Sequence, residues 1–311
     1  MEWYHYLIIS LAILLVAFLI TTYVCYRITF YVGKKKIYQM DEYDIPPGAP
    51  YEVFRDLMVL WQKEMRELPH EKVQIKSFDN LTLHGKYYPC GDSKILEIMF
   101  HGYRGSAERD LCGGIKRAFA LNHSVLIVDQ RAASNSDGHT ITFGVNERRD
   151  CISWLNYVNE NFGKDMKIIL CGVSMGAATV VLASEMELSE NVIGVLADCS
   201  YSTQKDIIKK FIKDMKLSPN FFYPFIKIGA KLFGRFDIEE RSPLEAIKNA
   251  KVPVLLFHGE DDSLVPYEMS IQLHKANEKI SKLVLIPKAD HCLCYLVEPE
   301  FYLKTMQEFF Q

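Results

Sequence analysis

The sequence predicts an α/β domain with a mostly parallel central sheet flanked by helices, preceded by an N-terminal transmembrane helix. Short runs that are apolar throughout alternate with segments of helical spacing, which is typical of parallel strands covered on both faces. An uncharged apolar run near the start of the chain is long enough to cross a bilayer. The 311 residues can form one large domain with a sizeable core.

Charge balance and composition exclude several classes of protein. Lys and Arg number 36 against 39 Asp and Glu, which gives a formal net charge of −3 and no basic surplus for a nucleic-acid partner. Apolar residues make up 49% and charged residues 24% of the chain, as in ordinary globular proteins. We therefore expect neither a disordered chain nor nucleic-acid binding.

Residues 1–36 are predicted to be a membrane anchor with a basic flank. No Asp, Glu, Lys or Arg occurs from residue 3 to residue 26, and about 20 apolar residues cross a bilayer as a helix. The alternatives are a cleaved signal peptide and a buried soluble helix. A signal peptide needs a positive residue before the apolar run and a small-x-small site after it, whereas Glu2 precedes the run and no good site follows.

Positive charges follow the apolar run and set its expected orientation. Arg27 and the lysines at 34–36 lie just after it, and positive flanks stay in the cytoplasm. We therefore expect a single-pass membrane protein whose C-terminal domain is cytoplasmic. The eight cysteines agree with this location, because several lie in apolar strand-like runs and are expected to be free buried thiols.

Residues 37–69 are predicted to be a linker followed by an amphipathic helix. Three prolines between residues 41 and 50 prevent a continuous helix, whereas residues 51–66 place apolar side chains at helical spacing. Alternation of apolar and polar residues at 73–78 and 81–88 predicts a β-hairpin.

Apolar runs alternate with helical patterns in the remainder of the chain, and the predicted domain extends over 70–311. The expected strands are 95–100, 124–129, 167–171, 192–198, 252–257 and 282–286. The expected helices are 109–121, 147–161, 175–187, 268–279 and 300–310. A helical, basic and Phe-rich segment at about 201–243 interrupts this order, and we interpret it as a small cap inserted over the open end of the sheet.

Two glycine-containing turns follow expected strands. Gly172-Val173-Ser174-Met175-Gly176 also precedes an expected helix, which is the context of a G-x-S-x-G nucleophile elbow. Ser174 is therefore the candidate nucleophile. His101-Gly102-Tyr103 forms the second turn, so the backbone N–H groups of Tyr103 and Met175 are the candidate oxyanion-hole donors. We expect His101 itself to hold the loop.

A serine nucleophile needs a base that is oriented by a third group. Asp262 and His291 each follow an expected strand and are the candidate acid and the candidate base. Asp261 and Asp290 are the alternative acids. The order Ser174, Asp262, His291, each after a strand, agrees with where α/β sheets place their chemistry.

These motifs resemble those of the α/β-hydrolase superfamily, and the likeness extends over about residues 70–311. It rests on the segments His101–Ser106, Val128–Gly138, Gly172–Gly176, His258–Pro266 and Ala289–His291. The chain is similar to the bacterial serine hydrolases, membrane-anchored or cytoplasmic, that carry a short helical cap. The sequence departs from the family at Ala132 and Ser134, where glycines are usual. The resemblance implies an α/β-hydrolase fold.

The motifs and the resemblance imply a serine hydrolase that cleaves a carboxylic ester or thioester through an acyl-enzyme. Its expected partners are the membrane and a small-molecule or lipid-like acyl substrate. A serine peptidase or amidase with the same triad, and a catalytically silent binding module, are the alternatives. We expect no cofactor and no metal: His291, Cys292 and Cys294 have a metal-ligand spacing, but no second Cys or His pair accompanies them in the sequence. The substrate and the oligomeric state stay open.

Overall fold

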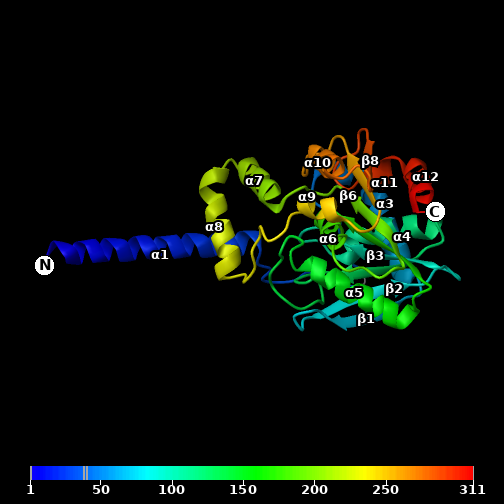
Figure 1. Cartoon of the computed structure of the whole chain (residues 1–311), viewed down its shortest axis with the longest axis horizontal. Coiled ribbons are helices and arrows are strands. Elements are labelled where there is room, and N and C mark those ends of the chain that lie inside the picture. Colours follow the sequence, from blue (N-terminus) through cyan, green and yellow to red (C-terminus); the bar gives the residue numbers. More distant parts are fainter. Residues whose placement is uncertain (1, 38, 40, 311) are drawn as a thin grey trace.

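The computed structural model describes residues 2–37, 39 and 41–310, and in this part of the chain a single eight-stranded β-sheet forms the centre (Figure 1). The strands are β1 (Glu71–Lys76), β2 (Thr82–Tyr88), β3 (Ile95–Phe100), β4 (Ser124–Asp129), β5 (Lys167–Val173), β6 (Val192–Asp198), β7 (Val254–Gly259) and β8 (Ser281–Ile286). Their order across the sheet is β1-β2-β4-β3-β5-β6-β7-β8. β2 runs antiparallel to β1 and β4, and the other neighbours are parallel, which confirms the predicted fold class.

Helices cover both faces of the sheet. From residue 41 on, the α-helices are α2 (Ala49–Glu52), α3 (Arg55–Glu67), α4 (Ala107–Ala120), α5 (Glu147–Phe162), α6 (Met175–Ala183), α7 (Gln204–Asp214), α8 (Pro219–Leu232), α9 (Pro243–Ala246), α10 (Glu268–Ala276), α11 (Cys294–Val297) and α12 (Pro299–Phe310). One apolar layer joins the sheet to α5, α6 and α10, and another joins it to α3, α4 and α12. Burial on both sides explains why the central strands are apolar throughout.

Several element ends differ from the expected ones by one to four residues, and two of the differences are informative. β7 begins at Val254, two residues later than predicted, because Pro253 has no N–H to donate to the sheet. The helix expected over 51–66 is divided at Val53 and Phe54, so that α2 and α3 are separate. Neither difference alters the order of the elements.

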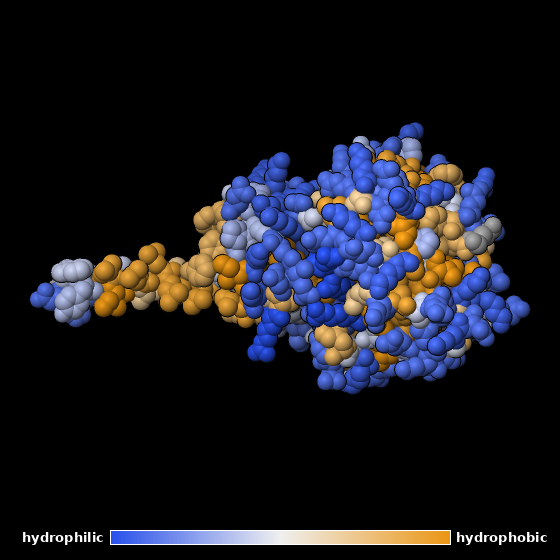
Figure 2. All heavy atoms as spheres, viewed as in Figure 1, coloured by the Kyte–Doolittle hydropathy of each residue, from blue (hydrophilic) through white to orange (hydrophobic). Residues whose placement is uncertain are grey.

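The first helix, α1 (Trp3–Thr29), extends away from the domain, and its surface is apolar over most of its length (Figures 1 and 2). Its most apolar 18-residue window has a mean hydropathy of 2.7 and is 6% buried. Every side chain from residue 3 to residue 20 is exposed. By length and composition, α1 can therefore cross a membrane.

The C-terminal end of α1 is built into the domain. Thr22, Tyr26 and Phe30 are buried, and Tyr26 and Phe30 pack in one apolar cluster with side chains of the cap helices α7 and α8. At Gly229 of α8, a Cβ atom would lie 2.8 Å from the Thr22 carbonyl oxygen, so the two helices approach closely only because this residue is glycine. The last turns of α1 therefore belong to the core.

In the loop that follows β4, two residues other than glycine adopt the left-handed backbone conformation that glycine usually adopts. Ala132 and Ser134 have φ values of 64° and 42°, in the left-handed region that disfavours L side chains. The Ala132 N–H donates to the Asp137 carbonyl oxygen at 2.8 Å, and Arg131 donates to both carboxylate oxygens of Asp150 at 2.7 Å. The departure from the family pattern therefore changes the side chains and leaves the left-handed conformation in place.

We expect Ala132→Gly to raise the free energy of unfolding by about 0.5–1 kcal/mol. Glycine relieves the left-handed strain at this position, and its greater freedom in the unfolded chain offsets part of the gain. Ala133→Gly is the matched control, because Ala133 has no positive φ, and it should lose about 0.5–1 kcal/mol. Thermal unfolding measures both changes. Destabilisation of equal size by the two substitutions would contradict the strain argument.

Phe30→Ala is expected to lower the free energy of unfolding by about 3–5 kcal/mol, because it opens a cavity in the core that α1 shares with the cap. Ile20→Ala is the control, since the Ile20 side chain is 58% exposed on the outer part of the same helix. Thermal unfolding of the full chain in detergent measures both. If Phe30→Ala were as mild as Ile20→Ala, the end of α1 would not belong to the core.

Candidate active site

Ser174 lies in a sharp turn between β5 and α6. Its φ of 54° and ψ of −117° are strained for an L residue, and its N–H donates to the Asp198 carbonyl oxygen at 2.8 Å. A Cβ atom on Gly172 would lie 2.1 Å from the Gly176 carbonyl oxygen, and one on Gly176 would lie 2.0 Å from the Phe100 carbonyl oxygen. Glycine at both positions is therefore a steric requirement of the elbow.

The loop after β3, residues 101–106, lies against this turn, and we call it the oxyanion loop after the role that the sequence predicts for it. A Cβ atom on Gly102 would lie 3.5 Å from the Ser174 Cβ and 3.9 Å from its Oγ. Within the residues that the structure describes, the Ser174 Oγ has no hydrogen-bond partner, and the N–H groups of Tyr103 and Met175 have no acceptor. A hydroxyl and two backbone donors are thus left unpaired next to one another, as an oxyanion hole requires.

His101 holds the oxyanion loop, in agreement with its expected role. Its Nδ1 donates to the Gly102 carbonyl oxygen at 2.8 Å, and its Nε2 accepts from the Gln130 N–H at 3.1 Å. The Gly102 N–H donates to Asp110 Oδ2 at 3.1 Å. Because both ring nitrogens are engaged, this imidazole is not free to act as a base.

Asp262 and His291 are brought together after β7 and β8. His291 Nδ1 lies 2.7 Å from Asp262 Oδ2, and His258 Nε2 lies 3.0 Å from the same oxygen. The other oxygen, Oδ1, accepts from the N–H groups of Leu264 at 2.9 Å and Val265 at 2.7 Å. The Asp262 carboxylate has no exposed surface, so these partners fix its position.

The two alternative acids have other environments. Asp290 Oδ1 accepts from the Ser263 N–H at 2.9 Å and from the His291 N–H at 2.6 Å, so Asp290 pins the backbone of the loop. The Asp261 side chain is exposed and has no hydrogen bond to the described part of the chain. Neither carboxylate contacts the His291 ring through a hydrogen bond, whereas Asp262 does.

The neighbours of His291 favour its protonated form. Burial lowers the pKa of the ring, but the hydrogen bond to Asp262 and the nearby Cys199 outweigh burial and raise the pKa to about 10. Burial also opposes protonation of His258, while Cys199 and Asp262 raise the pKa of His258 to about 9. Asp262 is therefore placed to stabilise positive charge on His291.

Cys199 is a neighbour of this pair that the sequence did not indicate. It follows β6, and its Sγ accepts from the backbone N–H of Cys292 at 3.2 Å. Asp198, the residue before it, accepts from the Ser174 N–H, so these two contacts link the serine turn to the loop that carries His291. The available sequence signal is that Cys199 also follows an expected strand, where the chemistry of such sheets gathers.

The oxyanion loop is also fastened to the end of α1. The Tyr103 hydroxyl donates to the Thr29 carbonyl oxygen at 2.7 Å. Arg104 Nη2 donates to the carbonyl oxygens of Ile28 at 2.9 Å and Tyr31 at 3.1 Å. The last carbonyls of a helix have no partner within the helix, and here the loop supplies it. Sequence patterns gave no signal for this contact.

The chain is similar in sequence to a curated bacterial protein. No family model matches the chain. It is 27% identical over 190 residues to the uncharacterized protein YqkD of Bacillus subtilis, a match that covers 61% of this chain and 62% of that protein. The chain thus spans about three fifths of the length of this relative.

Two solved structures are similar to the whole domain. The esterase Pf2001 of Pyrococcus furiosus matches with a TM-score of 0.63 and 24% identity, over 86% of this chain and 96% of the esterase. A puromycin-hydrolyzing peptidase of Mycobacterium tuberculosis matches with a TM-score of 0.58 and 18% identity, over 78% of this chain and 39% of the peptidase. These likenesses show that the chain has the α/β-hydrolase fold.

Proposed function

We propose that this protein is a serine hydrolase that cleaves a carboxylic ester or thioester with Ser174, His291 and Asp262. The observation that carries the proposal is the 2.7 Å hydrogen bond between His291 Nδ1 and the buried Asp262 carboxylate. Such a pair fixes the tautomer of the imidazole and leaves Nε2 to accept the serine proton. The strained turn at Ser174 supports the same assignment.

The reaction follows from the roles of these groups. His291 accepts the Ser174 proton while Oγ attacks the acyl carbon, and Asp262 stabilises the imidazolium that forms. The N–H groups of Tyr103 and Met175 donate to the oxyanion of the tetrahedral intermediate. His291 returns the proton to the leaving group, and water then cleaves the acyl-enzyme with the same assistance. No step calls for a metal or a cofactor.

In this proposal α1 is retained as a membrane anchor and the domain is cytoplasmic. The exposed residues 3–20 span about 27 Å at about 1.5 Å per residue, close to the roughly 30 Å of bilayer hydrocarbon. Cleavage of α1 as a signal peptide would remove Tyr26 and Phe30 from the core, which argues for retention. The lysines at 34–36 favour the cytoplasmic side.

A lipid-like acyl substrate fits this arrangement. Phe225 of α8 lies 5.5 Å, centroid to centroid, from Phe18 in the apolar part of α1, so the cap reaches the level of the bilayer. A pocket beside Met175 opens between the oxyanion loop and residues 32–36, which follow α1. Met175 lines this pocket and directly follows Ser174, and this proximity favours the pocket as the entry for an acyl ester.

A serine peptidase or amidase with the same three residues is the second candidate. It is favoured by the fold shared with the puromycin-hydrolyzing peptidase. Amide leaving groups need protonation more than ester leaving groups do, so initial rates on an acyl ester and its matched amide distinguish the two activities. Preference for the amide would replace the esterase assignment.

A fluorophosphonate probe is expected to label the wild-type protein and not Ser174→Ala, because only an activated serine reacts. Asp262→Asn should lower kcat for a p-nitrophenyl acyl ester by about 10³- to 10⁴-fold, since the imidazole loses its orienting carboxylate. Asp261→Asn is the matched control and should retain its activity, because that side chain is exposed. An unlabelled wild type would favour a catalytically silent binding module.

The pH profile of kcat/KM provides a separate test of His291. Because the protein raises the pKa of His291 above the usual 6.5, and only the neutral ring accepts a proton, activity should increase with pH through a value above 6.5. Asp262→Asn removes the negative charge that raises this pKa, so its residual activity should increase at lower pH. A shift in the opposite direction would exclude His291 as the base held by Asp262.

A further inference from the structure

Three thiols gather beside the His291–Asp262 pair. The sulfur atoms of Cys199 and Cys292 and one imidazole nitrogen of His291 all lie within 4.8 Å of one another. Asp198, Cys199 and Cys294 form a second group of this kind, which shares Cys199. In the sequence, His291, Cys292 and Cys294 lacked further Cys or His ligands, and the fold supplies Cys199 from the end of β6.

We propose that Cys199, Cys292 and His291 bind a thiophilic divalent cation such as Zn²⁺, and that the bound cation inhibits the hydrolase by occupying His291. The inhibition rests on the proposed function, in which His291 is the base. The binding itself does not depend on that function.

The donor set is one that zinc uses. Thiolates bind Zn²⁺ at about 2.3 Å and imidazole nitrogens at about 2.0–2.1 Å, so ligand atoms in a tetrahedral site lie about 3.5–3.8 Å apart. Separations of no more than 4.8 Å become this short through small side-chain rotations. Binding releases to solvent the thiol proton of each cysteine that becomes a ligand and the proton on the metal-binding nitrogen of His291, and Cys294 or a water molecule completes the coordination.

The surroundings already orient the three ligands. Cys199 and Cys292 have φ values of 57° and 56°, a conformation that non-glycine residues adopt mostly at functional or strained positions. The Cys292 N–H holds the Cys199 Sγ at 3.2 Å, and Asp262 holds His291 Nδ1 at 2.7 Å. In zinc proteins a carboxylate commonly orients a histidine ligand in this way, and the metal binds the other nitrogen.

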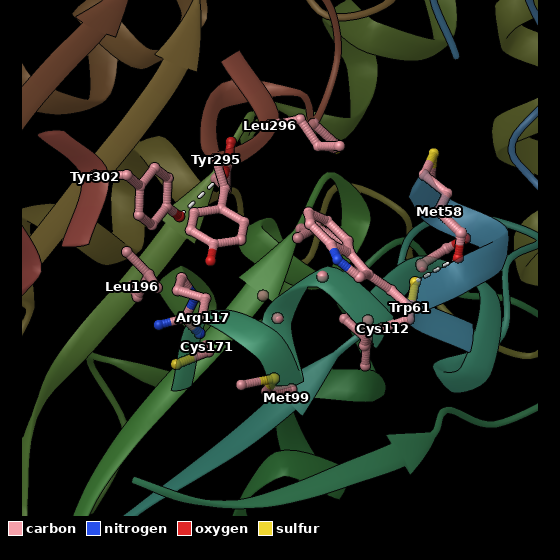
Figure 3. A pocket seen from close by; sticks show the side chains of 18 residues that line it. Met58, Trp61, Met99, Cys112, Arg117, Cys171, Leu196, Tyr295, Leu296 and Tyr302 are labelled. Atoms are coloured by element: carbon pink, nitrogen blue, oxygen red, sulfur yellow. Dashed lines mark hydrogen bonds between the residues drawn. The ribbon is translucent and has the colours of Figure 1, made fainter. Parts of the chain in front are cut away.

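A pocket bordered by α3 and α4 (Figure 3) has one member of the cluster, Cys292, in its lining. Trp61, Cys112 and Tyr295 line it, and its wall includes Asp198 and Cys292. Cys199 and Cys294 are buried, whereas Cys292 is partly exposed. An ion can therefore reach the cluster from the side of Cys292.

Cys151 is a buried thiol outside the cluster, and its surroundings differ from those of Cys199 and Cys292. Cys151 is fully buried in the apolar layer that also contains Trp154 and Leu155. Its sulfur has no hydrogen bond within the described residues and belongs to none of the clusters of candidate ligands found there. Cys151→Ser is therefore the matched control for loss of a buried thiol.

The test uses the full chain, reduced and freed of metal, and titrates it with Co²⁺ and then with Zn²⁺. One equivalent of Co²⁺ should produce a thiolate-to-cobalt charge-transfer band, and Zn²⁺ should remove it by displacement. Cys199→Ser and Cys292→Ser should each weaken Co²⁺ binding at least about tenfold, while Cys151→Ser binds as the wild type does. Cys292 is partly exposed, so its variant remains informative if Cys199→Ser fails to fold.

The outcomes separate the site from the function. Absence of the thiolate band, or a band that persists in both Cys199→Ser and Cys292→Ser, would overturn the site. Zn²⁺ should also block fluorophosphonate labelling of the wild type, and EDTA should restore it; binding without loss of labelling would overturn the inhibition. If the metal-free wild type is not labelled, the serine-hydrolase proposal fails, and the cobalt titration still tests the site.

Discussion

The close approach of α6 to β3 is the contact on which the candidate site depends. The Gly176 Cα faces the Phe100 carbonyl oxygen, and no side chain fits between them. The chain must therefore turn sharply at Ser174, and the complete burial of α6 keeps it in that strained conformation. Because Phe100 ends β3, the same contact brings the oxyanion loop beside the N-terminus of α6, where Met175 presents its N–H.

The sequence predicted those features whose structure is determined by a local pattern of residues. Apolar runs predicted the central strands, and the glycines around Ser174 predicted the elbow, because each depends on neighbouring residues alone. Contacts between distant segments were not predictable. The bond from Tyr103 to Thr29 and the approach of Cys199 to Cys292 depend on how several loop ends converge, and the residue types do not specify this. The start of β7 was displaced by a single proline, Pro253.

A buried carboxylate beside an imidazole can serve two kinds of chemistry. Asp262 accepts two backbone N–H groups on one oxygen and the His291 imidazole on the other, to which His258 Nε2 also lies close, so it is satisfied without solvent. An imidazole held in this way is a good proton acceptor, and for the same reason a good ligand for a metal ion. In the proposed metal site, the thiols of Cys199 and Cys292 allow a dissolved metal ion to compete with the serine proton for the same imidazole.

The fastening of the oxyanion loop to α1 bears on how the protein is prepared for study. A fragment that starts at residue 37 lacks the apolar helix α1. It also lacks Phe30 and the carbonyl oxygens that accept hydrogen bonds from Tyr103 and Arg104. Its cap would expose the apolar face that α1 covers, and its oxyanion loop would lose its outer support. Inactivity of such a fragment would then report a damaged loop rather than a requirement for lipid, so the detergent-solubilised full chain is the appropriate starting material.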